Sequence, residues 1–76
     1  MNEKIIQYYV NGEPQQTAVH KLTVKQILED AGFKPVEQYK LIRDEGDQAY
    51  TDYNEEVPIH KDERFTALFI GVTPTS

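Results

Sequence analysis

The side chains that usually carry catalysis or bind metals are sparse in this chain of 76 residues. His20 and His60 are its two histidines, and no cysteine is present to complete a zinc site with them. The acidic residues between 44 and 56 lack the spacing of a calcium-binding loop, and four glycines form no phosphate-binding motif. We therefore expect a protein that is not an enzyme, with no catalytic residues, no metal site and no cofactor.

A partner-binding surface is a better candidate, because side chains alternate between the two faces of a strand. The residues expected to point into the core are Leu41, Phe65, Ala67 and Phe69. Their neighbours Ile42, Leu68 and Ile70 would then point outward and form one exposed apolar patch. A register shifted by one residue inverts every side chain, and in that case these three residues belong to the core.

The end of the chain is a second candidate, because it follows directly on the last expected strand. We expect one domain over residues 1–71 and a flexible tail over residues 72–76. The candidate C-terminal handle consists of Gly71, Val72, Thr73, Pro74, Thr75 and Ser76. The alternative is an ordinary frayed chain end.

Charge and composition narrow the choice of partner. The chain has 8 basic and 13 acidic residues and a net charge of −5, which argues against nucleic acids and anionic membranes, because both select clustered Lys and Arg. A chain this short has room for one modest core. It has no apolar run long enough to cross a membrane, and its lack of cysteine fits a reducing compartment. We expect a monomeric, soluble protein of the cytoplasm.

The elements that would position these candidates begin with a hairpin. Residues 5–10 are rich in β-branched and aromatic side chains. They end at Asn11-Gly12, a pair that favours a two-residue hairpin turn because both turn positions need φ > 0. The partner strand is expected over residues 16–21.

One short helix is expected next. Thr23 and Gln26 have the spacing of a capping box, in which each end of the motif bonds the backbone of the other. Gly32 can adopt the left-handed conformation that ends a helix. The residues that share one helical face between these signals are Val24, Ile27, Leu28 and Ala31.

The second half of the chain contains three expected strands, residues 39–43, 48–51 and 64–70, with residues 52–58 as a loop or a single helical turn. The order β-β-α-β-β-β favours an α+β fold. Its mixed sheet of four to five strands would have the first and last strands as central neighbours and the helix packed across one face. This is the ubiquitin-like β-grasp arrangement.

Several short motifs carry a family resemblance. They are Val10-Asn11-Gly12, the stretch Leu22-Thr23-Val24-Lys25-Gln26-Ile27-Leu28, Ala31-Gly32, Tyr39-x-Leu41, and Glu63-Arg64-Phe65 leading to Gly71-x-Thr73-Pro74. In order and spacing they resemble the bacterial multi-ubiquitin-domain family over nearly the whole chain. Residues 59–68 also resemble the approach of ubiquitin to its last strand.

The resemblance implies a ubiquitin-like protein modifier of a bacterial conjugation system, of a kind that appears in phage defence. Its partners would be an activating enzyme, a conjugating enzyme and a deubiquitinase-like metalloprotease. The resemblance places Ile42, Leu68 and Ile70 where ubiquitin has its recognition patch, and Lys61 where ubiquitin has an acceptor lysine. Without the resemblance, Lys61 is an ordinary surface residue.

Two features depart from the family pattern. Family members often carry several domains in tandem, whereas this chain has one, and ubiquitin-type modifiers end in Gly-Gly, whereas this chain ends in Pro-Thr-Ser. Glycines suit activation because a tail without Cβ atoms can thread a narrow channel to the nucleotide. The alternative is a non-covalent β-grasp interaction or scaffold module that is never conjugated. A sulfur carrier ranks lower, because it would also need Gly-Gly.

Overall fold

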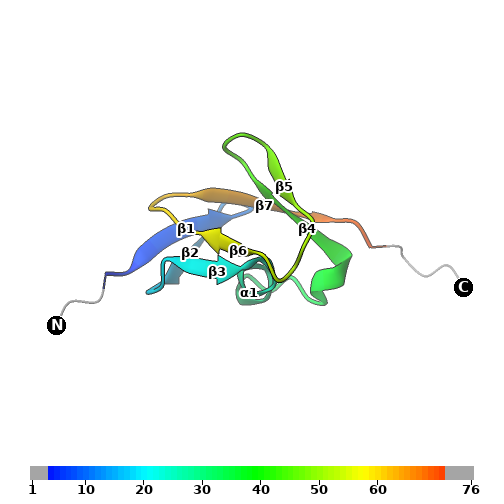
Figure 1. The fold of residues 1–76 in the computed structure, drawn as a ribbon, viewed down its shortest axis with the longest axis horizontal. Coiled ribbons are helices and arrows are strands. Elements are labelled where there is room, and N and C mark those ends of the chain that lie inside the picture. The colour runs from blue at the N-terminus through cyan, green and yellow to red at the C-terminus, as the bar shows by residue number, and fades with distance from the viewer. Residues whose placement is uncertain (1–3, 72–76) are drawn as a thin grey trace, which may run out of the picture.

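The computed structural model describes residues 4–71, which form a five-stranded sheet, a two-stranded sheet, one α-helix and one 3-10 helix (Figure 1). The elements are β1 (Ile6–Val10), β2 (Glu13–Thr17), β3 (Lys21–Thr23), α1 (Val24–Asp30), η1 (Val36–Gln38), β4 (Tyr39–Arg43), β5 (Gln48–Tyr50), β6 (Glu56–Pro58) and β7 (Arg64–Phe69). The residues of the expected tail, 72–76, lie outside the described residues.

The larger sheet is mixed and has the strand order β2-β1-β7-β4-β5. β7, the last strand in the sequence, pairs parallel with β1 and antiparallel with β4, so it occupies the centre. α1 packs against one face of this sheet (Figure 1). The predicted α+β class and the central placement of the first and last strands are confirmed, and the architecture is β-grasp-like.

The turn between β1 and β2 has the predicted chemistry, because Asn11 and Gly12 both have positive φ, 54° and 81°. The predicted second strand over residues 16–21 is wrong. A two-residue turn pairs the residues on either side of it, here Val10 with Glu13, so β2 begins directly after Gly12 and ends at Thr17.

The helix follows its capping signals. The Thr23 side chain accepts a hydrogen bond from the Gln26 N–H at 3.1 Å, and the helix ends in a Schellman motif, with Gly32 at φ 90°. The amides of Gly32 and Phe33 donate to the carbonyls of Glu29 and Leu28. The capping box itself is incomplete, because the Gln26 side chain donates to Asp30 instead.

Residues 52–58 do not form only a loop or a helical turn, because Glu56–Pro58 is strand β6. β6 pairs antiparallel with β3, of which only Lys21 was expected to be strand, as the last residue of the first hairpin. The short second sheet exists because residues 21–23, which follow the hairpin, pair with a strand that lies far away in the sequence. Two smaller differences from the prediction concern strand ends. β1 begins at Ile6 instead of residue 5, and β7 ends at Phe69 instead of residue 70.

The core lies between the five-stranded sheet and α1. The rings of Tyr8 and Phe65 meet edge to face, with centroids 6.1 Å apart. Burial raises the pKa of Tyr8 to about 12, with a smaller contribution from the charge of Asp30. The buried hydrophobic residues are Tyr8, Val10, Val24, Ile27, Leu28, Val36, Leu41, Tyr50, Val57, Ile59, Phe65 and Ala67.

Candidate functional site

One face of the larger sheet lies away from α1 and forms the open face. Residues opposite each other on neighbouring strands point to the same side, so the buried pair Leu41 and Ala67 identifies the helix side. The open-face positions of all five strands are Gln7, Tyr9, Pro14, Gln16, Lys40, Ile42, Ala49, Arg64, Thr66 and Leu68.

Two residues of the sequence-derived patch, Ile42 and Leu68, are diagonal neighbours on this face, and the third, Ile70, lies two residues beyond Leu68, after the end of β7. Ile42 is partly buried, while Leu68 and Ile70 are 48% and 49% exposed, so neither of these two belongs to the core. Ile42 and Leu68 stand on the neighbouring strands β4 and β7. Ile70 follows β7, and its N–H donates to the Gln38 carbonyl at 2.7 Å.

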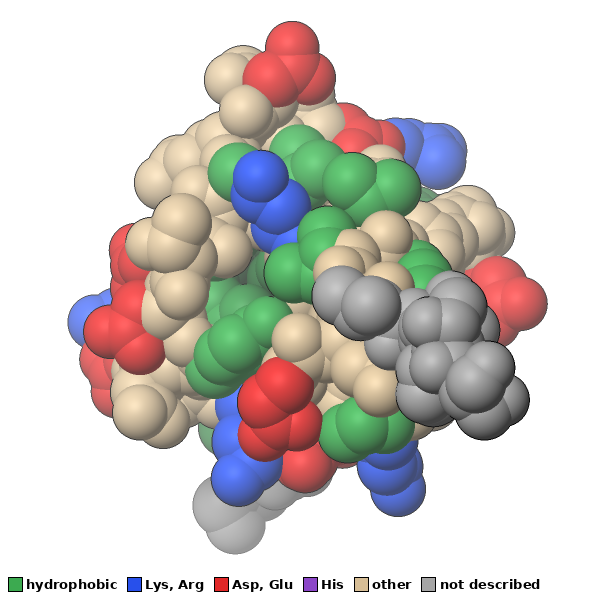
Figure 2. Space-filling model, turned by 90° about the vertical axis from the view of Figure 1, so that its right-hand side faces the viewer, with side chains coloured by type: hydrophobic (Ala, Val, Ile, Leu, Met, Phe, Trp, Pro, Cys, Tyr) green, Lys and Arg blue, Asp and Glu red, His purple; other side chains and the backbone are tan. Residues whose placement is uncertain are grey.

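Phe69 points to the helix side of the sheet, as expected, opposite Tyr39, but it is half-exposed and does not belong to the core. Its ring packs edge to face on Tyr39, which packs in the same way on Phe33. These two partners are themselves only partly buried, so the helix side of the sheet is incompletely covered here. Three consecutive apolar residues are therefore accessible at the end of β7, and Figure 2 shows hydrophobic side chains gathered at this end of the molecule.

The charge of the open face is opposite to that of the whole chain. Among the open-face positions, the ionisable groups other than Tyr9 are Lys40 and Arg64, both basic, although the chain has a net charge of −5. The Arg64 guanidinium lies 4.7 Å from the centre of the Tyr9 ring, within range of a cation–π interaction. A carboxylate, Asp44, reaches the margin of the face, where it accepts a 2.7 Å hydrogen bond from Thr66. The face combines apolar side chains with cations.

Asn11 links the first hairpin to the strand that carries this end of the face. Its backbone N–H donates to the Phe65 carbonyl. Its side chain accepts a hydrogen bond from the Ala67 N–H at 2.9 Å and donates one to the Ala67 carbonyl at 3.2 Å. The side-chain amide of Asn11 thus continues the hydrogen bonding to the β7 backbone beyond the end of β1.

Gly71 is the last residue that the structure describes. The N–H groups of Ile70 and Gly71 both donate to the Gln38 carbonyl, at 2.7 and 3.1 Å. A Cβ atom on Gly71 would lie 2.9 Å from both Cβ and Cγ of Gln38 and 3.0 Å from Cζ of Phe69. The close approach of the Gln38 side chain therefore favours glycine at this position, because any Cβ atom would displace Gln38. The other residues of the predicted handle, Val72 to Ser76, lie outside the described residues.

Gly71→Ala is expected to lower the free energy of unfolding by about 1 kcal/mol, the low end of overpacking costs, because the site lies near the surface. The added methyl group must displace Gln38, so the amide resonances of Ile70 and Gln38 should move. Urea unfolding and a two-dimensional amide NMR spectrum measure the two effects. Unchanged stability together with unchanged resonances would show that the close approach of Gln38 does not constrain the residue at position 71.

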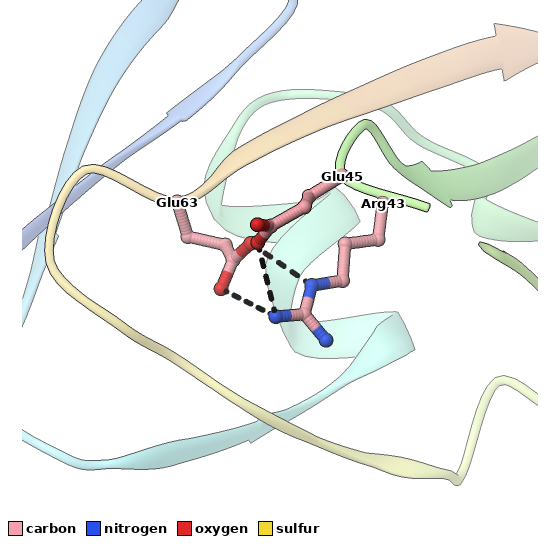
Figure 3. Close-up of polar contacts among 3 residues, drawn as sticks. All are labelled: Arg43, Glu45 and Glu63. Carbon is pink, nitrogen blue, oxygen red and sulfur yellow. Dashed lines mark hydrogen bonds and ion pairs between the residues drawn. The ribbon is translucent and has the colours of Figure 1, made fainter. Parts of the chain in front are cut away.

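A partly buried ion pair joins the end of β4 to the residue just before β7. The guanidinium of Arg43, at the end of β4, makes two hydrogen bonds to Glu63, of 2.9 and 3.2 Å, and approaches Glu45 at 3.7 Å (Figure 3). Glu63, just before β7, is only 7% exposed. The hydrogen bond to Glu63 and the negative charge of Glu63 raise the pKa of Arg43. The pair was not predicted from the sequence. Arg43 was expected at the end of a strand, and Glu63 in the turn before the last strand.

The remaining sequence candidates lie apart from this end of the sheet. Lys61 is exposed in the turn between β6 and β7, beside His60. His60 and His20 border one pocket of about 610 Å³, but within residues 4–71 no three acidic or imidazole side chains form a group that could hold a metal ion. The helices of the described residues are too short and too polar to span a bilayer.

Comparison of the chain with family models, with curated proteins and with solved structures gave no match. The fold and the surface geometry are therefore the ground on which a function can be proposed.

Proposed function

We propose that this protein is a ubiquitin-like modifier, or a modifier-like domain, of a bacterial conjugation system. Its partners are an activating enzyme, a conjugating enzyme and a deubiquitinase-like metalloprotease of the cytoplasm, and the pathway is one of phage defence. The enzymes recognise the C-terminal tail together with the open face around Ile42, Leu68 and Ile70. Lys61 serves as an acceptor if the modifier forms chains.

One observation carries this proposal. Three half-exposed apolar residues, Leu68, Phe69 and Ile70, lie at the end of the central strand β7 and directly after it, immediately before Gly71, the last described residue. Apolar side chains in this position give a partner a docking surface next to the point where a tail begins. The motifs that resemble the multi-ubiquitin-domain family continue past the same point, into Thr73-Pro74.

The chemistry that the proposal requires lies in the partners. A carboxylate oxygen at the end of the tail attacks the α-phosphorus of ATP, and pyrophosphate leaves. The thiolate of an enzyme cysteine then attacks the acyl carbon of the adenylate, AMP leaves, and a thioester forms. The modifier contributes the carboxylate, the reach of the tail and the docking surface, so it needs no catalytic side chain of its own.

Thioester formation tests the proposal. The full chain is incubated with ATP and the activating enzyme encoded beside it, and the products are separated on a non-reducing gel. We expect a band that disappears on treatment with thiol and that depends on ATP. If the native chain gives no band while a variant ending in Gly-Gly does, native conjugation is wrong.

The open face itself favours a second function, a non-covalent interaction or scaffold module. Ile42, Leu68 and Ile70 can bind a partner without any free carboxylate, and nothing in their geometry requires a covalent step. On this alternative, removal of residues 72–76 leaves partner binding intact, whereas on the modifier proposal it abolishes transfer.

A further inference from the structure

A small groove opens beside the patch, where β5 stops short of the full length of β4. Its lining residues are Lys40, Tyr50, Thr51, Tyr53 and Ile70. β5 pairs with β4 from Arg43 to Leu41 and ends there, so the edge of β4 at Lys40 is left beside the loop after Tyr50. Ile70 borders both the groove and the end of β7, which makes the groove continuous with the patch.

The walls of the groove are apolar and held in place. Tyr50 is buried, and this burial is the main cause that raises its pKa. The hydroxyl of Tyr53 donates a 2.7 Å hydrogen bond to the Tyr39 carbonyl, which fixes the ring against β4. Ile70 supplies the opposite, half-exposed wall. A groove with anchored aromatic walls can receive a side chain without first rearranging.

The volume of the groove is about 230 Å³. Sites for small molecules and cofactors usually enclose roughly 300 to 1,000 Å³, so this groove is below that range. One branched or aromatic side chain is an occupant of suitable size.

The charge of the groove indicates that its occupant carries a charged group beside the apolar side chain. Lys40 is its one basic group, and within residues 4–71 no carboxylate lies within salt-bridge distance of its ammonium group. The other cation at the open-face positions, Arg64, lies four residues along β7 from Leu68, the residue opposite Lys40, and none of these positions carries a carboxylate. The ammonium group of Lys40 is complementary to a carboxylate on the partner.

We propose that this groove binds an extended segment of a partner protein that presents one apolar side chain followed by an aspartate or glutamate. The apolar side chain lies between Tyr53 and Ile70, and the carboxylate pairs with Lys40. The inference deepens the proposed function, on which it rests only in that a partner protein docks at this end of the sheet.

Peptide titration of the isotope-labelled full chain tests the inference. The probe is the blocked peptide Gly-Ser-Leu-Asp-Ser-Gly, and the matched control replaces its Asp by Asn. Amide NMR spectra are expected to show shifts concentrated at Lys40, Thr51, Tyr53 and Ile70, with tighter binding of the acidic peptide. Equal binding of the two peptides, or shifts centred elsewhere, would overturn the inference.

Variants test the ion pair with Lys40 and the apolar contact with Ile70 separately. Lys40→Gln is expected to weaken binding of the acidic peptide by about two- to five-fold, because an exposed ion pair contributes up to about 1 kcal/mol, while Lys40→Arg retains it. Lys25→Gln, an exposed position on α1, should have no effect. Ile70→Ala should weaken both peptides to a similar degree. If Lys40→Gln and Lys25→Gln behave alike, the charge pairing does not exist.

Two further outcomes are informative. If the acidic peptide binds only after residues 72–76 are removed, the chain's own end is the occupant and the proposed partner segment is wrong. If the peptide binds as expected but no thioester forms with the activating enzyme, the modifier proposal fails while the groove assignment stands. If a thioester forms but the peptide does not bind, the groove assignment fails while the modifier proposal stands.

Discussion

Asn11→Ala is expected to lower the free energy of unfolding by about 2 to 4 kcal/mol. The change removes both hydrogen bonds between the side-chain amide and the backbone of Ala67, and a partly buried peptide group left without partners costs about 1 to 3 kcal/mol. Alanine also tolerates the positive φ of this position, 54°, poorly, which adds about 1 kcal/mol. Urea unfolding followed by fluorescence or circular dichroism measures the loss.

Two companion variants divide this effect into its causes. Asn11→Gly removes the side-chain hydrogen bonds but accepts the positive φ, so its cost should be smaller than that of Asn11→Ala by about 1 kcal/mol. Asn54→Ala removes an exposed asparagine side chain and should stay within about 0.5 kcal/mol of the native protein. A neutral Asn11→Gly would show that the link to Ala67 contributes nothing to stability.

Leu68→Glu is expected to weaken binding to the activating enzyme by about thirty-fold or more. This is the loss that a hot-spot residue with a contribution of about 2 kcal/mol produces. Leu68 is half-exposed, so the substitution should change the free energy of unfolding by no more than about 0.5 kcal/mol. Ile42→Glu should also weaken binding, since it introduces a charge into the same patch. Calorimetric titration gives the affinity, and urea unfolding verifies that the fold is intact.

Val19→Glu is the matched control for this substitution. Val19 is 49% exposed, nearly the same as Leu68, but lies in the segment between β2 and β3, away from the patch. The same change of charge and size at this position should leave the affinity unaltered. If Val19→Glu weakens binding as much as Leu68→Glu, the effect is one of net charge and the open face is not the docking surface.

Removal of residues 72–76 then distinguishes the two proposed functions. A modifier without these residues should fail to form the thioester. An interaction module should bind its partner as before, and should lose binding only with Leu68→Glu or Ile42→Glu. Loss of binding in the truncated chain, with the fold intact by circular dichroism, would contradict the interaction module.

Much of the local structure could be predicted from neighbouring residues. The Asn11-Gly12 turn and the helix from its N-cap at Thr23 to Gly32 depend on backbone sterics and hydrogen bonds that reach only a few residues along the chain. Strand alternation likewise predicted that Leu41, Phe65 and Ala67 are buried. These predictions succeed because the interactions that decide them are present in any chain with that local sequence.

The features that were predicted wrongly or not at all depend on contacts between distant parts of the chain. Residues 21–23 became β3 because residues 56–58 were available to pair with them, and Phe69 is exposed because the helix side of the sheet is incompletely covered at the end of β7. The bond of Asn11 to Ala67 and the ion pair of Arg43 with Glu63 join residues far apart in the sequence. No local pattern specifies such partners.

By itself, the sequence determined the elements that end in capping or turn residues, the α+β class and the apolar residues at positions 42, 68 and 70. Only the tertiary structure decided that Leu68, Phe69 and Ile70 are exposed together, that the surrounding face is basic in an acidic chain, and that Lys40 lies beside an aromatic groove. The reason is physical: backbone conformation responds to adjacent residues, whereas exposure and local charge depend on which distant segments come to lie on top of, or beside, a residue in the folded chain.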